Sequence, residues 1–154
     1  MIIQKFYQLY LKSAPPLQSI TLLFVRITIG WGFFLTGKGK LINIERTTNY
    51  FASLELPAPK FQAIMAGSTE MIGGMLLMIG LATRLISIPL VITMVVAYLT
   101  AHREEAFVSL SNFTDQDPYA FLMAALITLA FGAGKISLDH LLNPLLAKKL
   151  APEK

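Results

Sequence analysis

The stretch LQSITLLFVRITIGWGFFLT, residues 17–36, decides the fold. Arg26 is its only charged residue, and a helix needs roughly 17 to 25 mostly apolar residues to cross the hydrocarbon core of a membrane. A strand is a poor alternative, because strands use about 4 to 8 residues or alternate apolar and polar positions. The sequence therefore predicts a membrane-spanning helix here.

Three further stretches share this character. Residues 61–83 contain one charge, Glu70, whereas residues 85–101 and 118–134 contain none. Charged residues make up 14% of the chain, against about 25% in ordinary soluble domains. A soluble helical bundle would need polar helix faces, and the last two stretches offer only scattered Ser and Thr. We therefore predict an all-α fold, an integral membrane four-helix bundle in contact with the lipid bilayer.

An even number of spans places both termini on the same side of the membrane. Cytoplasmic loops carry the excess of Lys and Arg, and that excess lies on the terminal side here. We expect a multi-pass protein of the bacterial inner (plasma) membrane with both termini cytoplasmic. The net charge of +4 reflects this topology and does not indicate a nucleic-acid-binding surface. The terminal side carries Lys5, Lys12, Arg84, Lys135, Lys148, Lys149 and Lys154, and the far side carries Lys38, Lys40, Arg46, Lys60 and Arg103.

Composition divides the chain into three parts. Residues 1–16 resemble a short amphipathic lead-in at the membrane interface, ended by Pro15-Pro16. No small-residue cleavage site follows, which favours a retained helix over a signal peptide. Residues 17–142 are the predicted transmembrane domain, and residues 143–154 are a basic cytoplasmic tail.

The predicted connections differ in length. The first outer connection, residues 38–60, includes YFASLELPAP at 50–59, which is too apolar for a solvated linker. We expect an interfacial or re-entrant segment over the outer mouth of the bundle. The loop at Thr83-Arg84 is nearly a bare turn, so the second and third spans are expected to be antiparallel neighbours.

Arg26 and Glu70 are the two charges inside the predicted spans. A charge at mid-membrane costs at least about 2.5 to 3.5 kcal/mol on insertion scales, so each calls for an explanation. Both lie about nine residues into their spans, near mid-bilayer at about 1.5 Å per residue. This placement predicts a guanidinium–carboxylate pair, which is either structural or the centre of a polar pocket for a ligand or proton.

Both charges lie on helix faces rich in small residues, which let neighbouring backbones approach closely. Lys40 would join the face of the first span if that helix persisted, although Gly37 and Gly39 argue against it. The face of the first span holds Ser19, Arg26, Gly30, Phe33 and Gly37, and that of the second holds Ala63, Ala66, Gly67, Glu70, Gly73 and Gly74.

His102 ends the third span on the outer side. It is either an interfacial cap or a group that exchanges protons with the outer aqueous phase. The other histidine, His140, lies on the opposite side, so no metal site is expected. The chain has no cysteine, which excludes thiol catalysis, Cys-ligated zinc and iron–sulfur clusters, and no haem site is expected.

In their order and spacing, several motifs resemble the DoxX family of small four-helix membrane proteins. The resemblance implies association with membrane oxidoreductase systems, since relatives include the quinone-reactive subunit of a thiosulfate:quinone oxidoreductase. Family members often carry a histidine before the glycine that closes the first helix, where this chain has Thr36. The matching elements are Arg26, Gly37 to Lys40, LELP at 54–57, EMIGG at 70–74, IGLATR at 79–84, Ala101-His102 and GKISLD at 134–139.

Three hypotheses follow. The first is a quinone-linked redox subunit, in which a quinone enters from the lipid between the first two spans and receives electrons from a partner protein or a substrate. Its catalytic candidates are Glu70, Arg26 and His102, and its quinone-binding candidates are Arg26, Gly30, Lys40, Glu70 and Gly74. The second is a non-catalytic scaffold held together by the Arg26–Glu70 pair. The third is a small-solute or proton transporter, which would require a homo-oligomer.

Overall fold

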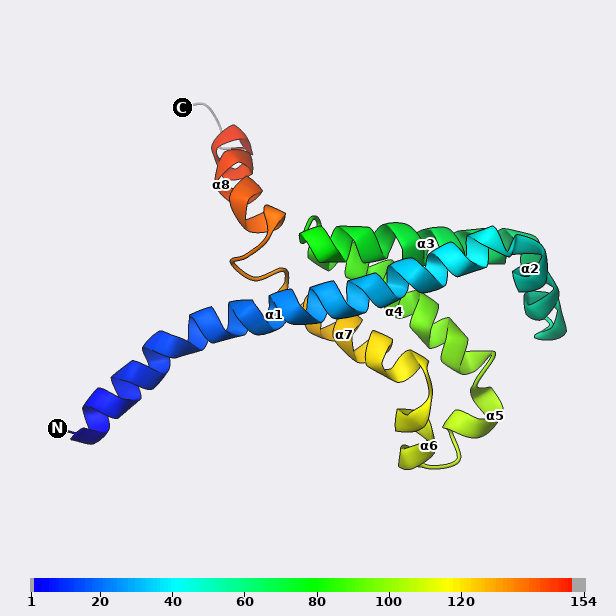
Figure 1. Cartoon of the computed structure of the whole chain (residues 1–154), viewed down its shortest axis with the longest axis horizontal. Helices are drawn as coiled ribbons and strands as arrows, with labels where there is room; N and C mark the ends of the chain where they lie inside the picture. Colours follow the sequence, from blue (N-terminus) through cyan, green and yellow to red (C-terminus); the bar gives the residue numbers. More distant parts are fainter. Residues whose placement is uncertain (1, 151–154) are drawn as a thin grey trace.

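The computed structural model of the protein describes residues 2–150, and every regular element in that range is an α-helix (Figure 1). The predicted all-α class is therefore confirmed. The helices are α1 (Ile2–Ile42), α2 (Ile44–Ser53), α3 (Pro59–Ile79), α4 (Thr83–Leu99), α5 (Arg103–Ala106), α6 (Leu110–Asp115), α7 (Pro118–Phe131) and α8 (Leu138–Leu150).

The four apolar stretches of the sequence correspond to α1, α3, α4 and α7. Two helical segments among the described residues are long and apolar enough to cross a membrane by themselves, namely Ala14–Ile42 and Pro59–Ile79. Helices α4 and α7 are also apolar but shorter, at 17 and 14 residues. The short helix α2 lies in the connection between α1 and α3, and α5 and α6 lie in the connection between α4 and α7.

Two predicted ends of the first helix are wrong. Helix α1 continues through Pro15 and Pro16, and at its other end it passes Thr36 and Gly39 before it ends at Ile42. A proline removes one backbone donor but is tolerated in apolar helices where neighbouring groups satisfy the backbone. Further along the helix, Ser19 Oγ donates to the Pro15 carbonyl at 3.0 Å, a bond to the carbonyl four residues earlier that helical serines commonly make. The N-terminal part of α1 extends away from the other helices (Figure 1).

Helices α1 and α3 pack closely along small residues, as the sequence predicted. A Cβ on Gly30 would lie 2.8 Å from the Gly74 carbonyl oxygen, and one on Gly37 would lie 2.6 Å from the Gly67 carbonyl oxygen. These contacts define an antiparallel register in which residues near 30 of α1 face residues near 74 of α3. Close backbone contact of this kind is the usual consequence of small residues at a helix interface.

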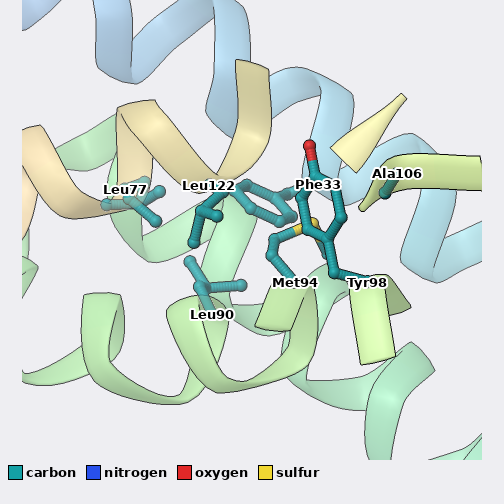
Figure 2. Close-up of a cluster of buried hydrophobic side chains, with 8 residues drawn as sticks. Phe33, Leu77, Leu90, Met94, Tyr98, Ala106 and Leu122 are labelled. Atoms are coloured by element: carbon teal, nitrogen blue, oxygen red, sulfur yellow. The ribbon is translucent and has the colours of Figure 1, made fainter. Parts of the chain in front are cut away.

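A compact apolar core joins α4 and α7 to α1 and α3. Leu90 of α4 and Leu122 of α7 point toward each other (Figure 2). The hydroxyls of Ser87 and Thr128 are buried and lie 2.8 Å apart, so these two polar side chains satisfy each other across the α4–α7 contact. The buried members of the core are Phe33, Leu77, Leu90, Met94, Tyr98, Ala106, Leu122 and Ala125.

The outer faces of the four apolar helices expose large hydrophobic side chains. So much exposed apolar surface marks contact with lipid or with another protein, and it is compatible with a bilayer around the bundle. The exposed residues include Phe24, Ile27, Trp31 and Leu35 on α1, Ile64, Met65, Ile72 and Ile79 on α3, Leu85, Ile88, Ile92 and Leu99 on α4, and Leu126, Ile127 and Phe131 on α7.

Candidate functional site

Glu70 forms an ion pair with Lys40 inside the helical bundle. Glu70 lies in the middle of α3 and is 1% exposed. Lys40 lies in the last turn of α1, one turn beyond Gly37, and its ammonium Nζ reaches Glu70 Oε2. The pair exists because α1 persists through Gly37 and Gly39. Lys40 therefore lies on the same face as Arg26 and Gly37, although the two glycines in the sequence argue against a helix that long.

The predicted Arg26–Glu70 pair is wrong. Arg26 is 1% exposed, and its Nη2 donates to the carbonyl oxygen of Ile136 at 2.6 Å. Its guanidinium lies directly against Gly80, where a Cβ would collide with it. Gly80 and Glu70 are ten residues apart in sequence, which is about 15 Å along a helix. In the antiparallel register, Arg26 therefore meets the end of α3 and not its middle.

Asp139 organises the turn against which Arg26 packs. Its carboxylate accepts the backbone N–H groups of Ala82 at 2.6 Å and Thr83 at 2.9 Å, and its own N–H donates to the Gly80 carbonyl at 2.9 Å. Ala82 has a φ of 50°, a left-handed conformation that is costly for a residue other than glycine. Asp139 thus holds the strained turn and caps the start of α4.

Arg26 and Asp139 belong to one structural clasp. Arg26 Nε and Nη1 are buried without a hydrogen-bond partner among the described residues, so packing and the bond to Ile136 hold the guanidinium. The clasp ties α1, the α3–α4 turn and the segment after α7 together. Asp139 ends the GKISLD motif at residues 134–139, but the positions of the apolar spans did not indicate that it caps a helix.

A cavity of about 470 Å³, here called the main cavity, lies beside the Lys40–Glu70 pair. Its volume lies within the range of roughly 300 to 1,000 Å³ typical of small-molecule sites. Lys40, Glu70 and His102 all line it, so three predicted site residues come together, whereas Arg26, Gly30 and Gly74 do not line it. The other lining residues include Thr36, Tyr50, Phe51, Leu54, Leu56, Met65, Thr69, Pro89, Ile92, Thr93, Met94, Val96, Ala97, Asp117 and Phe121.

His102 follows α4 at the rim of the main cavity. Its Nδ1 lies 2.6 Å from Gln116 Oε1, which is a hydrogen bond between the two ends of the α4–α7 connection. Asp117, the next residue, also lines the cavity. Sequence reasoning missed Gln116 and Asp117, because nothing in a polar loop indicates which residues turn back toward the bundle.

The connection after α1 covers one side of the main cavity. Tyr50 and Phe51 of α2, and Leu54 and Leu56 after it, line the cavity, which confirms that this apolar segment packs on the bundle. A second cavity of about 520 Å³ shares Lys40, Tyr50 and Phe51 with the main cavity. Lys40 borders both cavities, and Asn43, Arg46 and Thr47 are among the residues that line the second.

The predicted access route between the first two spans is closed, because Gly30 and Gly37 bring α1 into backbone contact with α3. The exposed lining of the main cavity includes residues of α3 and α4 instead. Met65 of α3 and Ile92 and Val96 of α4 line it and are also exposed on the apolar outer face. A ligand dissolved in the lipid would therefore reach the ion pair between these two helices.

An all-helical bundle with apolar outer faces, a buried ion pair and a ligand-sized cavity is compatible with a small helical membrane protein. Its sequence matches DoxX, a family of membrane proteins, over residues 21–103. That match covers more than half of the chain, and the chain belongs to the DoxX family.

Two relatives are each 30% identical to this chain. One is named "Putative oxidoreductase CatD", from Bacillus subtilis; the match extends over 117 residues and covers 76% of this chain and 83% of the relative. The other is an uncharacterized protein of Haemophilus influenzae, matched over 147 residues and 88% of each chain. No solved structure matches the chain significantly.

Proposed function

We propose that this protein is a subunit of, or an accessory to, a membrane oxidoreductase system and that it binds a quinone in the main cavity. The observation that carries the proposal is the Lys40–Glu70 ion pair on the wall of an otherwise mostly apolar cavity. The relative named as an oxidoreductase adds support. Arg26, Gly30 and Gly74 are withdrawn from the proposed quinone site because none of them lines the cavity.

The ion pair suits a quinone because the ring carries carbonyl oxygens that accept hydrogen bonds. The ammonium of Lys40 is a donor with a positive charge, and such donors in a water-poor site stabilise negative charge that develops on oxygen. Reduction of a quinone to a quinol takes up two electrons and two protons. Glu70, next to Lys40, is a carboxyl group that can pass a proton.

The proton supply can be proposed from the same geometry. His102 lines the cavity and lies within the loop that joins α4 to α7, and Lys40 also borders the second cavity, which Arg46 lines as well. Both are therefore placed to exchange protons between the cavity and water. The chain has no cysteine, so we propose that electrons come from a partner protein or directly from a substrate.

We further propose that all four apolar helices cross the bacterial inner membrane, with both termini in the cytoplasm. The apolar outer faces of α1, α3, α4 and α7 support this topology, as does the excess of Lys and Arg on the terminal side. The α4 and α7 helices span about 26 and 21 Å at 1.5 Å per residue, so the bilayer would thin locally beside them. The main cavity then opens in the outer half of the membrane.

The contacts of Arg26 within the clasp favour a structural role for this residue. This part of the scaffold hypothesis is therefore supported.

The scaffold hypothesis and the quinone proposal differ in whether a ligand binds. The test is to purify the protein in nanodiscs from a quinone-containing bacterium, extract the lipids and quantify quinone by mass spectrometry. We expect close to one quinone per chain; a quinone content equal to that of empty nanodiscs would refute quinone binding and leave the scaffold and transporter hypotheses.

A further inference from the structure

An apolar groove of about 280 Å³ runs along the α3–α4 surface next to the main cavity. Pro89 lines both, so the groove adjoins the cavity at this residue. Its lining residues are Leu76 of α3, Ala82 in the turn, and Leu85, Ile86, Ile88 and Pro89 of α4. We call these six residues the tail groove.

The two adjoining spaces differ sharply in polarity. The main cavity contains the charges of Lys40 and Glu70, whereas every residue of the tail groove is apolar. From Val96, at the cavity, to Leu85, at the far end of the groove, the distance along α4 is about 16 Å at 1.5 Å per residue. A molecule that occupied both spaces would need a polar head and a long apolar tail.

We propose that the tail groove is a second subsite that holds the hydrocarbon tail of the quinone whose ring lies at Lys40–Glu70. The inference rests on the proposed function and narrows its ligand class to lipid-soluble, long-tailed quinones. The occupant is the tail of the bound quinone, because the groove is wholly apolar and adjoins the cavity at Pro89, on the same helix pair. The outward opening at Met65, Ile92 and Val96 lets such a ligand enter from the lipid without leaving the membrane.

The test compares two ligands in two variants. Ile88→Trp fills the groove with a larger side chain, whereas Val95→Trp makes the same kind of change on the same helix outside the cavity and the groove. The two positions are similarly exposed, at 46% and 40%. Each variant is reconstituted in nanodiscs of the same lipid, and the Kd is measured for a quinone with a ten-carbon tail and for its tailless analogue. Partition of a ligand into the lipid affects the Kd of the variant and of the wild type equally, so it does not change their ratio.

We expect Ile88→Trp to raise the Kd of the tailed quinone at least about tenfold and to leave that of the tailless analogue within about twofold, because overfilling affects only the tail. Val95→Trp is expected to change neither. Equal effects of Ile88→Trp on both ligands, or no effect on either, would overturn the tail subsite while leaving the quinone site intact. Loss of co-purifying phospholipid from Ile88→Trp with an unchanged Kd for the tailed quinone would assign the groove to a phospholipid chain. A wild-type protein that bound neither ligand would refute the proposed function, and the subsite with it.

Discussion

Lys40 and Glu70 form an ion pair whose two members differ in exposure: the lysine side chain is 29% exposed and the glutamate side chain is 2% exposed. The carboxylate therefore depends on this one lysine for its charge partner, while the ammonium also borders two cavities. A buried carboxylate that borders an apolar cavity is costly to leave unpaired.

Lys40→Met is accordingly expected to destabilise the protein strongly. Removing one member of a buried pair costs about 3 to 5 kcal/mol, because the other charge stays buried. The melting temperature in detergent, measured for Lys40→Met, Glu70→Gln and the double variant, checks this. The double variant is expected to be more stable than Lys40→Met, since it leaves no unpaired charge; equal melting temperatures for Lys40→Met and the wild type would contradict the pairing.

The contact between α1 and α3 makes Gly30 a sensitive position. An alanine there would place its Cβ 2.8 Å from the Gly74 carbonyl oxygen, so the helices would have to separate. We expect Gly30→Ala to cost about 1 to 3 kcal/mol. Gly39→Ala is the matched control on the same helix, because no atom lies within 4 Å of its Cβ position. The control is expected to be neutral or to stabilise the helix by up to about 1 kcal/mol.

Gly30→Ala and Gly39→Ala are compared by their melting temperatures in the same detergent. If Gly30→Ala proved as stable as Gly39→Ala, the close approach of α1 and α3 would be wrong.

Asp139→Asn tests the clasp. The carboxylate accepts two backbone N–H groups at the start of α4, and a negative charge is favourable at a helix N-terminus. The amide keeps one acceptor oxygen and loses the charge, so we expect a loss of about 1 to 2 kcal/mol in the free energy of unfolding. Asp115→Asn, on an exposed carboxylate in α6, is the control and is expected to change stability little. Equal stability of the two variants would argue against the capping role.

The sequence predicted the helical class and the buried faces well, because small and apolar residues recur at helical spacing. Ser19, Arg26, Gly30, Phe33 and Gly37 were assigned to one face of the first helix, and all of them are buried. The same periodicity predicted that small residues of α3 would meet α1. Helix faces are readable from a sequence since they depend only on residue spacing along one helix.

The residues that contact those faces from neighbouring helices could not be predicted, because these contacts depend on where each helix ends. The sequence ended the first helix at Thr36, whereas it continues to Ile42. Six further residues bring Lys40 to Glu70 and leave Arg26 at the far end of α3. Gly37 and Gly39 suggested a helix end, but the first packs against α3, and an isolated glycine costs only about 1 kcal/mol within a helix.

In the proposed quinone site Lys40, and not Arg26, contacts the quinone ring. The most direct measurement is the Kd of a tailless quinone in nanodiscs for the wild type, Lys40→Met and Arg26→Leu, taken at a temperature at which all three are folded. We expect Lys40→Met to raise the Kd at least about tenfold, which corresponds to about 1.4 kcal/mol, and Arg26→Leu to leave it within about twofold. A Kd that rose in Arg26→Leu and stayed unchanged in Lys40→Met would contradict the account.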